Sequence, residues 1–206
     1  MINKQYKDRM NKIEQGCKRS VDFVIAACCL VVFSPLALAC ALAIRKEDGL
    51  PVIYKQERIG LHGKPFYIYK FRSMRIDAEK DGPDLLEIKG DPRLTKVGRF
   101  LRAHHLDELP QLWNVFKGDM SFIGPRPERK FYIDQIMEHD SRYQFLYQIR
   151  PGGTSYATLY NGYTDTMEKM LRRLELDLYY LEHRSWWFDA KILLKTFSNI
   201  VFGKKF

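Results

Sequence analysis

The chain has 206 residues, a length that allows one folded domain with its own core. Hydrophobic residues make up 46% and charged residues 29%, which is ordinary for a folded protein. The formal net charge of +9 favours partners that carry negative charge, namely phosphates, anionic lipid headgroups or nucleic acid. A solvated basic surface without such a partner explains the charge equally well.

The cysteines exclude a secreted scaffold held together by disulfides. All of them lie within the first 40 residues, at Cys17, Cys28, Cys29 and Cys40. A disulfide framework would spread its cysteines through the folded part, so the pattern predicts a reducing compartment. No Cys/His spacing is typical of a zinc site, and we interpret the cysteines as small apolar residues.

The first predicted element is an apolar run from Phe23 to Ile44, which holds 22 residues without a charge. A straight helix of that length just crosses a hydrocarbon core of about 30 Å. A cleaved signal peptide is one interpretation, although the run is long for the apolar part of such a peptide. A single spanning helix is another, but it should have more Lys and Arg on one side, and here both flanks are basic.

A re-entrant helical hairpin, which enters and leaves the membrane on one face, is the third interpretation. Ser34-Pro35 stands in the middle of the run, and Pro35 cannot donate a hydrogen bond to the carbonyl of Val31. The Ser34 hydroxyl can satisfy a carbonyl freed in this way. A proline kink in an ordinary spanning helix is the alternative, but basic residues on both flanks favour the hairpin.

Two strands and a long loop follow the apolar run. Residues 52–59 and 66–72 predict strands on either side of a turn at 60–63. Alternation places Lys70 and Arg72 on one face of the second strand, where two cations could grip a diphosphate. An ordinary solvated strand end is the alternative. Residues 76–95 are polar and broken by Gly-Pro and Gly-Asp-Pro, which predicts a loop.

A basic helix is predicted over residues 97–106, followed by a new helix that begins at Asp107. Asp107 is a favourable N-cap, and Pro110 is tolerated within a first turn. The spacing of the large apolar residues predicts one buried face, made of Leu109, Leu112, Trp113 and Phe116. Gly118 is a typical stop.

The remaining elements alternate stiff turns with helices. Residues 124–127 (Gly-Pro-Arg-Pro) predict a rigid turn that presents Arg126, and Arg150 opens a second turn over 150–154. Helices are predicted over 131–149 and over 168–183, the latter carrying Asp177. Residues 186–206 mix aromatic residues with lysines, which suits either a helix in the lipid headgroup region or packing on the core.

The adjacent pair Asp107-Glu108 is the strongest candidate for chemistry. A carboxylate at a helix N-terminus usually only caps the helix, but the same position favours a phosphate group. Arginines on nearby segments, namely Arg99, Arg102, Arg126 and Arg150, make phosphoryl transfer through an enzyme-bound intermediate chemically reasonable. A metal ion would offset the repulsion between carboxylate and diphosphate. His104-His105 suggests a general base, but adjacent histidines on a basic segment are more often surface residues.

Five motifs in a fixed order resemble the bacterial sugar transferase family, the monotopic polyprenyl-phosphate phosphoglycosyltransferases. They are Tyr69-Lys-Phe-Arg-Ser-Met74, Asp91-Pro-Arg-Leu-Thr95, Leu106-Asp-Glu-Leu-Pro-Gln-Leu-Trp-Asn114, Lys117-Gly-Asp-Met-Ser-Phe-Ile-Gly-Pro-Arg-Pro127 and Arg150-Pro-Gly152. The resemblance covers roughly residues 18–195. The chain is similar to the minimal form, the small initiating glycosyl-1-phosphate transferases, without the extra spanning helices of larger members.

The resemblance implies an α+β monotopic membrane protein with a re-entrant membrane helix, interfacial amphipathic helices and a small β-sheet. Residues 1–46 would hold the membrane segment, and residues 47–206 would form the catalytic region with a C-terminal interfacial helix. The location would be the cytoplasmic face of the bacterial inner membrane. The products of such enzymes start surface glycans such as capsule, exopolysaccharide, O-antigen or glycoprotein.

The resemblance also implies a reaction and its residues. Asp107 would attack the β-phosphate of a UDP-sugar and release UMP, and undecaprenyl phosphate would then take the phospho-sugar from Asp107. Glu108 would assist through Mg²⁺ or proton handling. Lys70, Arg72, Arg102, Arg126 and Arg150 are the expected phosphate-binding residues, and Asp107, Glu108 and Asp177 the expected Mg²⁺ ligands. Expected partners are the UDP-sugar, undecaprenyl phosphate, inner-membrane lipids and downstream glycosyltransferases, with no nucleic acid.

The sequence departs from the family pattern at two places. Many members continue the Arg-Pro-Gly turn with Ile-Thr-Gly-Trp-Ala-Gln, where this chain has Gly153-Thr-Ser-Tyr-Ala-Thr158. Many also have an arginine where Tyr163 stands here. The donor pocket is therefore expected to differ, and no sugar is carried over. The competing hypothesis is a membrane-tethered module that binds nucleic acid or lipid without catalysis, which accounts for the charge but not for the paired carboxylates.

Overall fold

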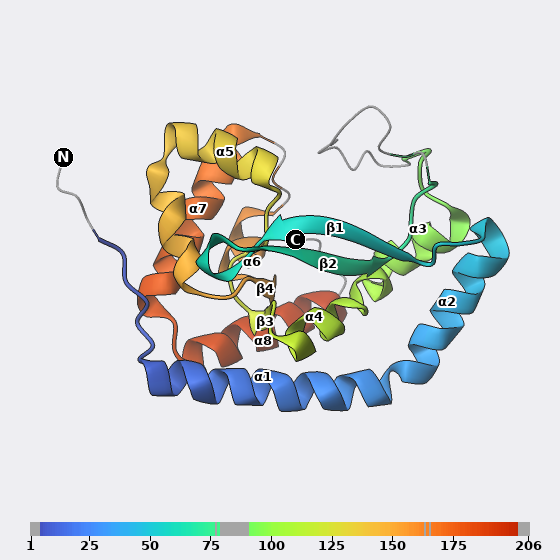
Figure 1. Cartoon of the computed structure of the whole chain (residues 1–206), viewed down its shortest axis with the longest axis horizontal. Coiled ribbons are helices and arrows are strands. Elements are labelled where there is room, and N and C mark those ends of the chain that lie inside the picture. Colours follow the sequence, from blue (N-terminus) through green and yellow to red (C-terminus); the bar gives the residue numbers. More distant parts are fainter. Residues whose placement is uncertain (1–4, 77, 79–90, 163, 165, 202–206) are drawn as a thin grey trace.

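The computed structural model describes residues 5–76, 78, 91–162, 164 and 166–201. The fold is of the α+β class, mostly helical with small sheets (Figure 1). Two consecutive helices, α1 (Lys12–Val32) and α2 (Ser34–Asp48), lie along one edge of the molecule and turn up at one end. The other elements pack on their inner side.

The break between α1 and α2 falls where the sequence predicted it, at Ser34-Pro35. The two helices meet at an angle of 60°, and the Ser34 hydroxyl donates a 2.8 Å hydrogen bond to the carbonyl of Val31. In the described part of the chain no single helix is long and apolar enough to cross a bilayer, whereas this bent pair meets the criteria of length and composition. The re-entrant arrangement in a membrane stays a prediction.

A capping box starts α1. The Asn11 side chain accepts hydrogen bonds of 2.9 Å from the backbone N–H groups of Ile13 and Glu14, and the Glu14 carboxylate accepts one from the N–H of Asn11. The helix therefore begins at a residue fixed by local sequence.

Strands β1 (Ile53–Ile59) and β2 (Pro65–Phe71) form an antiparallel pair, each within one residue of its predicted bounds. The 3-10 helix η1 (Leu61–Gly63) makes the turn between them. A second sheet was not expected: β3 (Ser121–Ile123) runs parallel to β4 (Gly152–Thr154), so part of the predicted turn at 150–154 is a strand. Glycine permits this pairing, because a Cβ on Gly152 would lie 2.1 Å from the backbone nitrogen of Gly124.

In the chain, β2 is followed by α3 (Lys96–Ala103), the 3-10 turn η2 (Leu106–Glu108) and α4 (Gln111–Lys117), and then by β3. The predicted buried face of α4 is confirmed only in part, because Leu109 and Phe116 are partly buried and pack on core groups. Trp113 is 47% exposed, whereas Gln111, Asn114 and Val115 are the buried residues. The aromatic face lies instead against α1, where the rings of Phe116 and Phe23 stack at 4.8 Å.

The C-terminal half is helical, with α5 (Lys130–His139), the 3-10 helix η3 (Ser141–Gln148), α6 (Tyr156–Asn161), α7 (Met167–His183) and α8 (Trp186–Val201). One helix was predicted over 131–149. Asp140 interrupts it in an extended conformation and accepts a hydrogen bond from the N–H of Arg142, so its side chain caps the following turn.

Three groups of buried apolar residues hold these elements together. The largest joins α5, η3, α7 and α8 around Leu174, Leu178 and Leu181. A second fills the space between α1, β2 and α4, and a third lies between α2, α3 and β2. The two smaller groups place β2, α3 and α4 directly on the helical hairpin. The division into segments 1–46 and 47–206 stays a prediction.

Candidate active site

Asp107 and Glu108 lie in the short connection between α3 and α4. His105, in a left-handed conformation with φ 55°, ends the preceding segment, and η2 follows at once. Asp107 is therefore not the N-cap that the sequence predicted. It lies inside the 3-10 turn, and α4 begins only at Gln111 without a side-chain cap.

Asp107 is buried, with 7% of its surface exposed. Burial raises the pKa of its carboxyl group, and the negative charge of Glu108 raises it further. The positive charges of Lys70 and Arg102 act in the opposite direction. A desolvated carboxylate beside cations is suited to attack on an electrophile, because water does not screen it and neighbouring charge keeps it accessible in the ionised form.

Glu108 forms an ion pair with Lys70 of β2, with 2.7 Å between Glu108 Oε1 and Lys70 Nζ. Burial alone would raise the pKa of Glu108, but Lys70 and Arg126 outweigh it and lower the pKa to about 2. The pKa values of the two adjacent carboxyl groups are thus shifted in opposite directions. Glu108 is ionised at neutral pH, while Asp107 is the more basic of the two.

Lys70, Arg102 and Arg126, three of the five predicted phosphate-binding residues, surround this carboxylate pair. Arg102 on α3 donates a 2.9 Å hydrogen bond from Nε to the Ser73 hydroxyl, and its charge reaches Asp107. Arg126 comes from the predicted turn at 124–127, and its charge reaches Glu108. Cations from β2, α3 and this turn therefore converge on one place.

Arg72 and Arg150 are bound elsewhere. Arg72 is buried and donates to the carbonyls of Asp48 and Gly49 at 2.7 and 3.1 Å, where α2 ends. Arg150 donates from Nε to the carbonyl of Gly118 at 2.8 Å, just beyond α4. Each satisfies the carbonyl end of a helix in this structure. Their expected role in phosphate binding stays a prediction.

Asp177 occupies a separate small cavity of about 10 Å³, which Arg126, Glu128 and Arg173 also line. Arg173 pairs with Glu128, while Oδ1 of Asp177 has no hydrogen-bond partner within the described part of the chain. Burial raises the pKa of Asp177 to about 8. Arg126 lines this cavity, and its charge also acts on Glu108.

The expected Mg²⁺ ligands do not form one cluster. Among the residues that the structure describes, no three His, Cys, Asp or Glu side chains lie close enough together to hold a metal ion. Asp107 and Glu108 nevertheless fit the ion, because Mg²⁺ is commonly bound through one or two carboxylates together with phosphate oxygens and waters. Coordination by Asp177 as well stays a prediction.

The two histidines are exposed. The His104 ring packs on Phe100 at 4.3 Å, and its Nδ1 lies 2.9 Å from the Phe100 carbonyl. The charge of a protonated His105 would lower the pKa of both Asp107 and Glu108. Neither histidine is in a position that indicates a general base.

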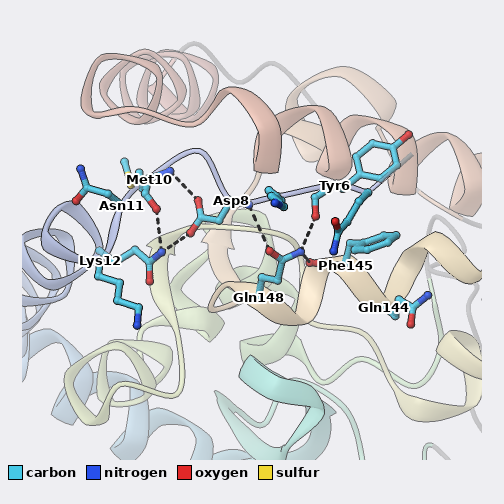
Figure 2. Close-up of a pocket in the computed structure, with 11 residues that line it drawn as sticks. Tyr6, Asp8, Met10, Asn11, Lys12, Gln144, Phe145 and Gln148 are labelled. Carbon is cyan, nitrogen blue, oxygen red and sulfur yellow. Dashed lines mark hydrogen bonds between the residues drawn. The ribbon is translucent and has the colours of Figure 1, made fainter. Parts of the chain in front are cut away.

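A cavity of about 580 Å³ is lined by residues of the N-terminal segment and of η3. Figure 2 shows it between the N-terminal segment and η3, where Gln148 accepts a hydrogen bond from the N–H of Asp8 and donates one to the carbonyl of Tyr6. None of the predicted site residues lines it. Its hydrogen bonds tie the start of the chain to η3, which indicates a structural role.

Ser73 and Asn114 contribute to the site but were not predicted. Ser73 receives Arg102, and Asn114 is completely buried beside β2. One signal in the sequence could have pointed to Asn114, because it is a polar residue inside an otherwise apolar helical segment, and buried polar groups require specific partners.

Comparison with known proteins agrees with the motifs. The family model described as bacterial sugar transferase matches residues 13–203. A UDP-glucose:undecaprenyl-phosphate glucose-1-phosphate transferase of Caulobacter vibrioides is 43% identical over 89% of this chain and 69% of its own length. A UDP-N-acetylgalactosamine-undecaprenyl-phosphate N-acetylgalactosaminephosphotransferase of Aeromonas hydrophila is 40% identical over 90% of this chain, and an uncharacterized sugar transferase, EpsL, of Bacillus subtilis is 38% identical over 89%.

The matched share of each relative differs. This chain spans 44% of the length of the Aeromonas protein and 87% of the Bacillus protein. The matched region includes both helices of the hairpin, the carboxylate pair and the surrounding cations. The chain belongs to the bacterial sugar transferase family.

Proposed function

We propose that this protein transfers a sugar-1-phosphate from a UDP-sugar to undecaprenyl phosphate. In the first step an Asp107 oxygen forms a bond to the β-phosphorus, and the bond from that phosphorus to the bridging oxygen breaks, so that UMP leaves. In the second step a phosphate oxygen of undecaprenyl phosphate attacks the same phosphorus and Asp107 is released. The product is the undecaprenyl-diphosphate sugar, which would begin a surface glycan.

The observation that carries this proposal is the difference between two adjacent carboxyl groups. Glu108 is held ionised by Lys70 at 2.7 Å, while burial makes Asp107 the more basic neighbour. A nucleophile next to a permanently charged partner, with Arg102 and Arg126 available for phosphate oxygens, suits a two-step phosphoryl transfer.

Magnesium is part of the proposal. When bound, Mg²⁺ supplies positive charge that offsets repulsion between the carboxylates and the diphosphate. Asp107 and Glu108 would hold it. Lys70, Arg102 and Arg126 would orient the phosphate groups, and the buried position of Asp107 would limit attack by water on the intermediate.

The surface next to the site suits a lipid acceptor. Large apolar side chains stand exposed on both arms of the hairpin, including Val31 at 74% and Leu38 at 61%. Trp113 of α4 and Trp187 of α8 are also exposed, and Figure 1 shows both helices beside α1. Lys191 lies over the Trp187 ring at 5.3 Å, a combination suited to lipid headgroups. We place this surface in the cytoplasmic leaflet of the inner membrane, where undecaprenyl phosphate is reached laterally.

The sugar is left open within the proposal. Relatives of similar identity are named for glucose and for N-acetylgalactosamine. The departures from the family pattern fall on β4 and α6, where Thr154 contacts Thr196 and Ser155 caps α6. Tyr163 lies outside the described residues.

The test uses the full chain in lipid nanodiscs with Mg²⁺, undecaprenyl phosphate and a panel of UDP-sugars. UMP release and the intact protein mass are measured. Asp107→Asn should abolish both UMP release and the added mass of the phospho-sugar. Asp134→Asn is the matched control, because Asp134 is exposed on α5 and pairs only with Lys130 among the described residues; it should behave as the unmodified protein.

Full activity of Asp107→Asn would refute the role of Asp107. If no UDP-sugar yields UMP or a mass adduct, the proposed activity is wrong. In that case, DNA binding that weakens steeply with salt would favour the non-catalytic alternative.

A further inference from the structure

The helix that follows the carboxylate pair is fastened to the membrane hairpin at its far end. Arg19 of α1 donates hydrogen bonds to the carbonyls of Val115 and Phe116, at 2.8 and 2.7 Å. These carbonyls belong to the last turn of α4, where the carbonyl of Val115 also accepts a 3.1 Å hydrogen bond from the N–H of the C-cap residue Gly118. The guanidinium therefore caps α4, and a planar fork with two donors fixes direction as well as distance.

The middle of the same helix is fastened to the strand that carries Lys70. The Asn114 amide accepts a 3.1 Å hydrogen bond from the N–H of Tyr69 and donates a 2.7 Å bond to the carbonyl of Tyr67. Both groups belong to β2, and Lys70 is the next residue. Asn114 is fully buried, so water cannot replace either hydrogen bond.

These contacts close a ring of elements around the ion pair. Lys70 extends from β2 to Glu108, Glu108 leads through Leu109 and Pro110 into α4, and Asn114 returns from α4 to β2. If Asn114 releases β2, apolar packing around Ile68 and Val115 still keeps the two elements together, but the Lys70–Glu108 contact is then the hydrogen-bonded link that is left on that side of the ring among the described residues. Because the pair is partly exposed, such a contact alone is weak.

We infer that Asn114 and Arg19 are positioning residues. Asn114 sets the distance between Lys70 and Glu108, and Arg19 fixes the same helix, and with it the carboxylate pair, relative to the membrane hairpin. This inference rests on the proposed function for its catalytic meaning, but not for its geometry. The hairpin would thereby hold the reacting groups at a defined place relative to the bilayer.

The experiment compares Asn114→Ala with Val115→Ala. Val115 is the next residue of α4 and is also buried, so its truncation loosens the core but leaves the two hydrogen bonds from Asn114 to β2 in place. The primary readout is hydrogen–deuterium exchange of the backbone amides of residues 105–109, the turn that carries the carboxylate pair. It requires no activity and therefore separates this inference from the proposed function.

The expected result is that these amides exchange at least about threefold faster in Asn114→Ala than in Val115→Ala, because the first variant alone releases the turn from β2. The kcat for UMP release should fall at least about tenfold in Asn114→Ala, with KM for the UDP-sugar little changed. Unchanged exchange in Asn114→Ala, or an equal increase in both variants, would overturn the inference.

Arg19→Gln provides a second variant, because Arg19 is only half-buried and the change should be tolerated by the fold. Arg45→Gln is its control, since Arg45 is exposed on α2 and the same charge is removed. We expect a smaller increase in the exchange of residues 105–109 for Arg19→Gln and none for Arg45→Gln. If Asn114→Ala does not fold, this pair decides the question, and equal behaviour of the two variants would refute the link to the hairpin.

Discussion

Replacing Asp177 by asparagine is expected to stabilise the protein by an amount that grows with pH. Asp177 is 2% exposed, and its Oδ1 has no hydrogen-bond partner among the residues that the structure describes. Burial raises its pKa to about 8 from an ordinary value of 3.8. Asparagine has the shape of the protonated acid and carries no charge, so it occupies the cavity without the cost of keeping a proton bound or of burying an anion.

The size and sign follow from the two pKa values. Below about pH 4 the side chain is protonated in both the folded and the unfolded chain, and asparagine gives no advantage. As the pH rises, the unfolded chain releases the proton while the folded protein keeps it, so the free energy of unfolding falls with pH and levels off above pH 8. At pH 7 this difference amounts to up to about 4 kcal/mol.

Thermal unfolding of the detergent-solubilised protein between pH 4 and pH 8 provides the measurement. The midpoint of Asp177→Asn should match that of the unmodified protein at pH 4 and exceed it increasingly toward pH 8, while Asp134→Asn shows no such trend. A variant that is less stable at pH 8 would mean that Asp177 is ionised and paired in the fold. The same variant tests magnesium binding, because loss of a ligand would raise the Mg²⁺ concentration needed for UMP release.

Three further substitutions probe the site and its supports. Lys70→Met should raise the pKa of Glu108 from about 2, as measured by carbon-13 NMR. It should also remove the loss of stability that the unmodified protein shows as the pH falls from about 4.5 toward 2. An unchanged pKa would contradict the ion pair. Gly98→Ala should lower the free energy of unfolding by several kcal/mol, and the thermal midpoint with it, because the new Cβ would lie 1.9 Å from the backbone oxygen of Ser73. Gly16→Ala, an exposed helical position with no atom within 4 Å of the new Cβ, should instead stabilise α1 by about 0.5–1 kcal/mol; a loss of stability there would show that α1 has a neighbour not accounted for.

Local sequence determined several features of this protein. The break at Ser34-Pro35 is fixed because proline lacks the N–H that a continuous helix needs. The strands of the first hairpin, β1 and β2, follow from alternation and from the turn between them, and both were found within one residue. The ordered motifs were sufficient for the family, because each depends on residue identity along the chain and not on contacts between distant segments.

Other features depend on packing between segments that are distant in the chain. Periodicity showed that α4 has an aromatic face but not which neighbour that face meets. Phe116 packs against α1 and the second core group, whereas Trp113 is exposed. Asp107 is a residue type that favours N-caps, but capping also requires a particular backbone conformation. The left-handed conformation of His105 places Asp107 inside a 3-10 turn instead.

The tertiary structure also determined which partners the Lys and Arg side chains of the site bind. Lys70, Arg72, Arg102 and Arg150 have long side chains that can reach several acceptors, and the sequence contains no information on which acceptor the fold brings near. In the folded protein Lys70 forms an ion pair with Glu108, and Arg72 forms hydrogen bonds with the end of α2. The sequence thus determined the residue types of the site. The tertiary structure determined their partners, and therefore their acidity and roles, because burial removes water and leaves each charge beside the neighbour that the fold supplies.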